Sequence, residues 1–206
     1  MNFFEIEEKD LEKSKVICHS GGALGSDTEF EKKCSYFGIQ VRAYSYKTNY
    51  HNSPNKFEIS DEDYLEGVNE INKANKILRR YNINKFMNLL ARNWSQVKYS
   101  EQIFAVGSIV DPKKKSKSGY YSKSDYQTVD GGTGYACMMA VLHQKELFVF
   151  DQEKLCWFRW SYPAMKFVKC ENPVITKHNF AGIGTRQIND DGIKAISSLF
   201  ERTFKN

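Results

Sequence analysis

The sequence predicts an α/β protein whose mostly parallel sheet is flanked by helices and carries an appended β-hairpin. Two repeated patterns support this fold class. Short apolar runs typical of buried parallel strands occur along the chain, and glycine-rich turns lead into segments of helical periodicity. A chain of 206 residues, 41% of them hydrophobic, can bury a core, so we expect a single domain over residues 1–206.

Composition narrows the classes of function. A net charge of +5 is too weak to argue for nucleic-acid binding by itself. Five cysteines without a CxxC pair favour reduced thiols over a disulfide framework or a metal site, and we expect Cys18 and Cys137 to be buried. The first ten residues are acidic, and no apolar run approaches the ~20 residues of a membrane span. We therefore expect a cytoplasmic protein with no membrane partner.

A βαβ unit with a glycine-rich turn follows an acidic lead-in over residues 1–14, to which we attach no function. The apolar strand that begins at Lys15 ends in a turn over residues 20–25. Ser26 or Asp27 should cap the next helix. That turn suits phosphate binding or simply close packing of helix on sheet, and the pattern alone does not decide. Phe30, Cys34 and Phe37 repeat at helical spacing, and Gly38 should end that helix as its C-cap glycine. The next strand covers residues 39–44.

The next segment is a polar loop followed by an amphipathic helix. Residues 45–60 are polar and predict a loop, and the helix begins at Asp61 with Ser60 or Asp61 as its cap. Arg79 and Arg80 fall in its last turn, where the helix dipole favours cations, and we attribute no further role to them.

Arg92 and Asn93 lie among core-type residues, just ahead of an apolar strand over residues 102–106. Because an unpaired buried charge is costly, Arg92 needs a partner. The spacing leaves open whether that partner is a protein carboxylate or the phosphate of a ligand. Residues 107–128 are rich in lysine and tyrosine and form either a flap over a ligand site or a solvated lysine loop, which we favour.

Residues 131–134 contain three glycines and open a mostly apolar helix over residues 135–142, which should be buried on most sides. A helix that starts in such a turn presents free N–H groups and its positive dipole end to an anion. A buried parallel strand over residues 146–151 follows. Two further runs, residues 156–160 and 165–169, flank Ser161-Tyr162-Pro163, and the second alternates apolar and charged residues. We expect them to form the antiparallel hairpin, over residues 156–170.

A third strand, glycine turn and amphipathic helix end the chain, with the turn at residues 182–186. Turns that follow parallel strands meet at the carboxyl edge of the sheet, where open α/β folds bind ligands. The three turns, at residues 20–25, 131–134 and 182–186, together predict a nucleotide-type site there.

These residues resemble the SLOG group of Rossmann-like domains, which includes the DNA-processing protein A and Lonely Guy families. The resemblance lies in His19-Ser20-Gly21-Gly22-Ala23-Leu24-Gly25-Ser26-Asp27, in Arg92-Asn93 and in Gly131-Gly132-Thr133-Gly134, and extends as scattered motifs from Lys15 to Phe204. It implies a Rossmann-like fold, a nucleotide ligand and a homo-oligomer.

The order of one motif differs from that group. There the strand with a Gly-Ser/Thr-Arg motif comes first, whereas Gly184-Thr185-Arg186 and its helix lie near the C-terminus here. This order implies a circular permutation, which places the C-terminal strand beside the first strand, inside the sheet.

We expect the ligand to be a nucleotide or an NAD-derived nucleotide such as ADP-ribose, held by a sensor or sequestering module. Its phosphates should contact backbone N–H groups of the glycine turns, and arginine should supply charge. The expected ligand-binding residues are Ser20, Gly21, Gly22, Ala23, Gly25, Asp27, Arg92, Asn93, Gly131, Gly132, Thr133, Gly134, Gly184, Thr185 and Arg186.

Two other hypotheses remain. Lonely Guy phosphoribohydrolases carry Gly-Gly-x-Gly-Thr-x-x-Glu, but Tyr135 stands at the threonine position here and Met138 at the glutamate position, and a thioether transfers no proton. Asp27 and Asp130 are the candidate catalytic carboxylates of a different N-glycosidase or nucleotide hydrolase. The third hypothesis, DNA binding, draws on the lysine loop and the basic charge.

Overall fold

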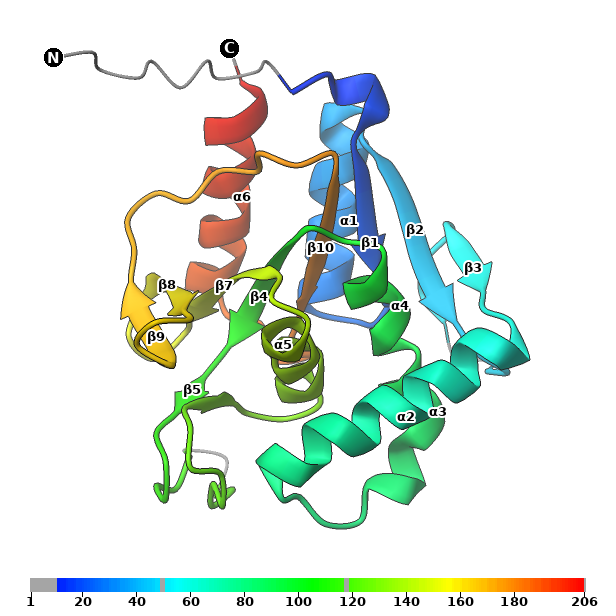
Figure 1. Cartoon of the computed structure of the whole chain (residues 1–206). Helices are drawn as coiled ribbons and strands as arrows, with labels where there is room; N and C mark the ends of the chain where they lie inside the picture. Colours follow the sequence, from blue (N-terminus) through cyan, green and yellow to red (C-terminus); the bar gives the residue numbers. More distant parts are fainter. Residues whose placement is uncertain (1–10, 49–50, 117–118, 206) are drawn as a thin grey trace, which may run out of the picture.

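The computed structural model describes residues 11–48, 51–116 and 119–205, which form a Rossmann-like α/β fold (Figure 1). Its main sheet has eight strands, with bounds β1 Ile17–Ser20, β2 Gln40–Ser45, β3 Lys56–Glu58, β4 Gln102–Gly107, β7 Glu146–Asp151, β8 Cys156–Ser161, β9 Lys166–Lys169 and β10 Asn179–Gly184. The spatial order is β3-β2-β1-β10-β4-β7-β8-β9. Pairing is parallel from β3 to β7 and antiparallel for β8 and β9, which confirms the predicted hairpin.

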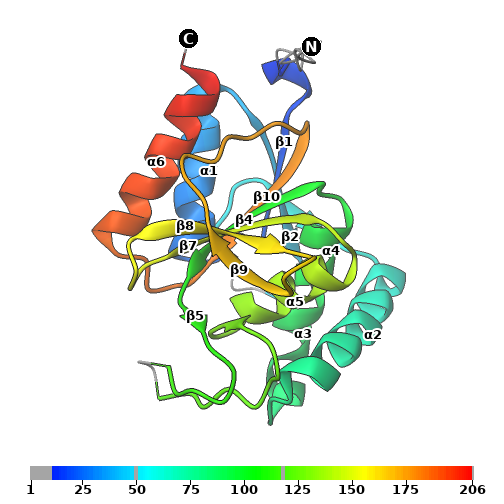
Figure 2. The same ribbon diagram turned by 60° about the vertical axis from the view of Figure 1, so that its left-hand side comes forward.

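Helices cover both faces of this sheet, and its central strands are accordingly mostly apolar. Every residue of β4 is buried, as expected for a strand covered on two sides. Figure 2 shows α1 and α6 on one face and α2, α3, α4 and α5 on the other. Helix bounds are η1 Lys13–Lys15, α1 Ser26–Phe37, α2 Asp61–Leu78, η2 Ile83–Phe86, α3 Met87–Ala91, α4 Asn93–Lys98, α5 Thr133–Leu142 and α6 Asp190–Phe204.

The C-terminal strand lies inside the sheet, as the permuted motif order predicts. Cys18 of β1 pairs with Phe180 of β10, and Gly182 of β10 pairs with Phe104 of β4. Phe180 of β10 and Phe200 of α6 are both fully buried in the same hydrophobic cluster, so the C-terminal segment is part of the core.

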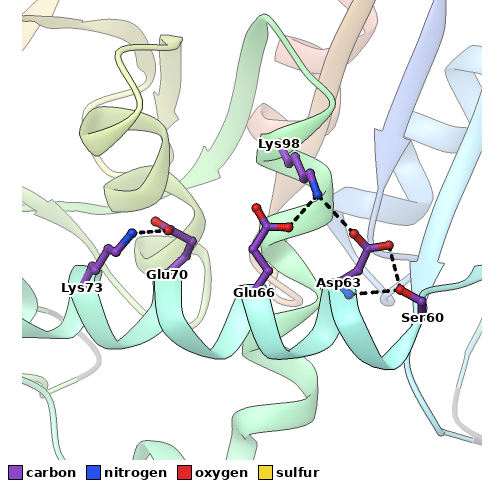
Figure 3. Close-up of polar contacts among 6 residues, drawn as sticks. All are labelled: Ser60, Asp63, Glu66, Glu70, Lys73 and Lys98. Atoms are coloured by element: carbon purple, nitrogen blue, oxygen red, sulfur yellow. Dashed lines mark hydrogen bonds and ion pairs between the residues drawn. The ribbon is translucent and has the colours of Figure 1, made fainter.

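Polar contacts hold α2 in place on the other face. Ser60 Oγ accepts a hydrogen bond from Asp63 N at 3.0 Å and so caps the helix, as predicted (Figure 3). Lys98 of α4 reaches across to Asp63 at 3.2 Å and Glu66 at 2.5 Å. One helical turn on, Glu70 contacts His143 at the end of α5 at 2.7 Å. These contacts fix the N-terminal half of α2, whose other end, at Leu78, leads to the cavity.

Three predictions about local structure are wrong. The polar segment 45–60 contains the edge strand β3, whose three residues are all exposed and so show no apolar pattern. The N-cap of α1 is Gly25, because the Ser26 hydroxyl donates to the carbonyl of Thr185 at 2.9 Å instead. The turn at residues 131–134 follows no strand of the main sheet, but a separate antiparallel pair, β5 Ile109–Val110 and β6 Thr128–Val129.

The sequence-based expectations about membrane spans and cysteines can also be compared with the structure. Within the described residues, no helix combines the length and the apolar character needed to cross a membrane. All five cysteines are free, and Cys18 and Cys137 are buried as predicted. The first ten residues of the acidic lead-in lie outside the described residues.

Candidate functional site

A cavity of about 810 Å³ opens where the carboxyl ends of the central parallel strands meet the start of α5. Residues from all three predicted turns line it together, although long stretches of sequence separate them. The predicted binding residues that line the cavity are Ala23, Asp27, Arg92, Asn93, Gly131, Gly132, Thr133, Gly184, Thr185 and Arg186.

The other predicted binding residues, Ser20, Gly21, Gly22, Gly25 and Gly134, are not among the lining residues. Their role is to shape the turns. Ser20 Oγ donates to Glu31 at 2.5 Å and accepts from Gly22 N at 3.2 Å. Gly25 has a φ of 95°, and a Cβ there would lie 2.6 Å from the carbonyl oxygens of Thr185 and Arg186. The absence of that Cβ lets the first and third turns pack together.

The start of α5 offers backbone donors to the cavity. Gly131 has a φ of 64° and its amide donates to Asp130 Oδ1 at 2.7 Å. The next amides, those of Gly132 and Thr133, belong to the first helical turn, whose N–H groups have no acceptor within the helix. Both residues line the cavity, so the positive end of the α5 dipole faces it.

Arg80 lines the cavity and holds this glycine turn, a role that sequence reasoning missed. Because α2 ends at Leu78, Arg80 lies beyond the helix and is not a dipole partner within its last turn. Its guanidinium donates to the carbonyl oxygens of Val129 at 2.6 Å and Gly131 at 2.5 Å. It also lies over the rings of Tyr120, at 4.8 Å, and Tyr135, at 5.2 Å. Thus the carbonyls of the turn are bound by Arg80.

Arg92 and Asp27 form the buried polar floor of the cavity. Arg92 Nη1 donates to the carbonyl oxygens of Tyr44, at 2.8 Å, and Gly21, so its hydrogen-bond partners are backbone groups. Asp27 accepts from the amides of Ala23 at 3.3 Å and Gly184 at 3.2 Å and thereby joins the first and third turns. Burial raises the pKa of Asp27 to about 6, although the nearby Arg92 charge opposes this shift.

Arg186 completes the charged side of the cavity. It is exposed at the end of the third turn and lies among the lining residues. Its positive charge is close enough to Arg92 to contribute to lowering the pKa of that buried guanidinium, which burial lowers most. Arg186 and Arg92 are therefore neighbouring guanidinium groups of the cavity, which Arg80 also lines beside the start of α5.

One wall of the cavity is apolar and aromatic. The connection from α2 to α3 and the start of α3 supply Tyr81, Ile83, Phe86, Leu89 and Leu90. The lysine-rich segment 107–128 contributes Gly107, Ser108 and Tyr120 to the lining. That segment therefore lies against the cavity, as the flap interpretation requires. Hydrophobic spacing gave no signal for this wall, because its residues belong to short elements.

Several candidate groups have structural roles. Asp151 is buried and accepts from the amides of Ile109, Glu153 and Lys154. Met138 is buried in the hydrophobic core and does not line the cavity, so the glutamate position of the Lonely Guy pattern lies away from it. In the part of the chain that the structure describes, no group of three or more His, Cys, Asp or Glu side chains is arranged to hold a metal ion.

Comparisons of the chain with protein-family models, curated proteins and solved structures found no match. The resemblance to the SLOG group therefore stays a prediction, and the function is argued from the geometry of the cavity.

Proposed function

We propose that the protein binds a nucleotide or an NAD-derived nucleotide in this cavity, as a sensor or sequestering module. The observation that carries the proposal is the convergence of the α5 N-terminus and the Arg186 side chain on one cavity at the carboxyl edge of the parallel sheet. Helix N-termini favour anions, and open α/β sheets bind ligands at this edge. The volume of about 810 Å³ accommodates a ligand of that size.

Each side of the cavity has a role in this proposal. The amides of Gly132 and Thr133 and the Arg186 guanidinium bind phosphate. Asp27 and Asn93, on the polar floor, bind ribose hydroxyls. The apolar wall borders the rest of the ligand. The oligomeric state and the cytoplasmic location stay predictions from the sequence.

Calorimetric titration with AMP, ADP-ribose and NAD tests the proposal. We expect micromolar binding of at least one of them. We expect Arg186→Ala to weaken it about tenfold or more, because a hydrogen bond to a charged group contributes about 1.5–3 kcal/mol. Lys194→Ala removes an exposed charge on α6, outside the cavity lining, and should leave affinity unchanged. Wild-type protein that binds none of the three would refute the proposal.

One observation favours a second function, hydrolysis of the N-glycosidic bond. Asp27 lines the cavity with a pKa of about 6, and a carboxyl with a pKa near the working pH suits general acid catalysis. Release of free base from AMP or NAD, lost in Asp27→Asn or Asp130→Asn while binding persists, would support this function. Inactivity across a panel of nucleotides would remove it and leave the binding module.

A further inference from the structure

Four aromatic side chains line the cavity, and three of them already have a cation over the ring. Lys123 Nζ lies 4.3 Å from the ring centre of Tyr81. The Arg80 guanidinium lies over both Tyr120 and Tyr135. Among the described residues, Phe86 has neither a cation nor an aromatic ring packed on it, and 58% of its surface is exposed. Phe86 therefore presents to the cavity an apolar ring face that is free to stack on a planar ligand.

The position of Phe86 relative to the proposed phosphate site suits a nucleotide. Leu90 is the wall residue next to the start of α5, since its Cδ2 atom lies 3.6 Å from where a Cβ of Gly132 would be. Phe86 immediately precedes α3, four residues before Leu90, and lines the same cavity. A ligand whose phosphate lies at Gly132 and that follows this wall beyond Leu90 would meet Phe86. Ile83 and Leu89 border the same wall.

We propose that Phe86 is the base-stacking residue of the cavity and that, with Ile83 and Leu89, it forms the subsite for the planar heteroaromatic base. This inference rests on the proposed nucleotide function and adds to it the end of the cavity that recognises the base. The wall offers ring stacking and apolar contact, so it distinguishes ligands with a base from those without one.

The test compares AMP with ribose 5-phosphate, which keeps the phosphoribose and lacks the base. Phe86→Ala should weaken AMP binding about tenfold or more, as expected for a lost base-stacking contact, and should leave ribose 5-phosphate binding unchanged. Phe86→Tyr keeps a ring and should retain the wild-type affinity for AMP. Tyr36→Ala is the matched control, because Tyr36 on α1 is 81% exposed and does not line the cavity.

Circular dichroism of each variant establishes that it folds, which the exposure of Phe86 leads us to expect. If wild-type protein binds none of AMP, ADP-ribose and NAD, the nucleotide function itself fails and the base subsite with it. If wild-type protein binds AMP but Phe86→Ala changes neither affinity, or weakens AMP and ribose 5-phosphate alike, the function stands and Phe86 is not the base-stacking residue.

Discussion

Arg79 and Arg80 are neighbours in sequence with different roles in the structure. Arg79 pairs with Asp125 at 2.7 Å, and both side chains are about half exposed. Arg80 instead binds the carbonyls of the glycine turn and lies over the ring of Tyr120. Sequence reasoning assigned both to the helix dipole, because nothing local reveals contacts with residues some forty to fifty positions away.

Arg80→Met should affect both stability and binding. It removes three side-chain hydrogen bonds, one to the Tyr120 hydroxyl and two to the carbonyls of Val129 and Gly131, so we expect a loss of about 1–3 kcal/mol in the free energy of unfolding. AMP affinity should fall because the turn is no longer held. Arg79→Met breaks an exposed ion pair and an exposed 3.3 Å hydrogen bond to the carbonyl of Lys123, and should cost less than about 1 kcal/mol, with affinity unchanged. Urea denaturation measures the stability of each variant, and calorimetry measures its AMP affinity. Equal losses in Arg80→Met and Arg79→Met would contradict the role given to Arg80 in holding the glycine turn.

Asp27 should make the stability depend on pH. Its pKa rises from an ordinary value of 3.8 to about 6, so the folded state keeps a proton that the unfolded state has released between these values. Stability is therefore highest below about pH 4 for this group and falls by about 3 kcal/mol as the pH rises through 6. In Asp27→Asn this decline should disappear, as urea denaturation at several pH values can show. An identical pH profile in the variant would mean that Asp27 ionises normally.

Among the helices and strands, those with a periodic apolar pattern were predicted from the sequence, and the short or exposed strands were not. The buried strands β4 and β7, the helices α2 and α5, and the hairpin of β8 and β9 follow from apolar spacing. The edge strand β3 and the two-residue strands β5 and β6 carry no such signal, since their pairing depends on neighbours distant in sequence. For the same reason the glycine turns of the site were predictable and its apolar wall was not.

The junction between α1 and the third turn should be sensitive to a single methyl group. Gly25→Ala places a Cβ 2.6 Å from two backbone carbonyls at a φ of 95°, so the two turns must move apart. Gly38, at the other end of α1, has a φ of 72° with open space around it, and Gly38→Ala should cost only about 1 kcal/mol of left-handed strain. We expect Gly25→Ala to cost more and also to weaken ligand binding. Equal losses in the free energy of unfolding for Gly25→Ala and Gly38→Ala, measured by urea denaturation, would show that the two turns can move apart at little cost.

At the scale of the whole molecule, the sheet order explains how the site is assembled. Because β10 lies between β1 and β4, the turn that carries Arg186 emerges beside the turn after β1, although the two are at opposite ends of the chain. The α2–α3 connection and the segment 107–128 close the other side. DNA binding, the third sequence hypothesis, stays a prediction; Lys113 and Lys123 of that segment already contact Asp125 and Tyr81.

The central claim is that this cavity binds a nucleotide, and native mass spectrometry of freshly purified protein tests it most directly. We predict an added mass that denaturation releases as a nucleotide, or, for protein purified empty, micromolar binding of added AMP, ADP-ribose or NAD. Either signal should weaken in Arg186→Ala. Wild-type protein that carries no nucleotide and binds none of the three would contradict the account.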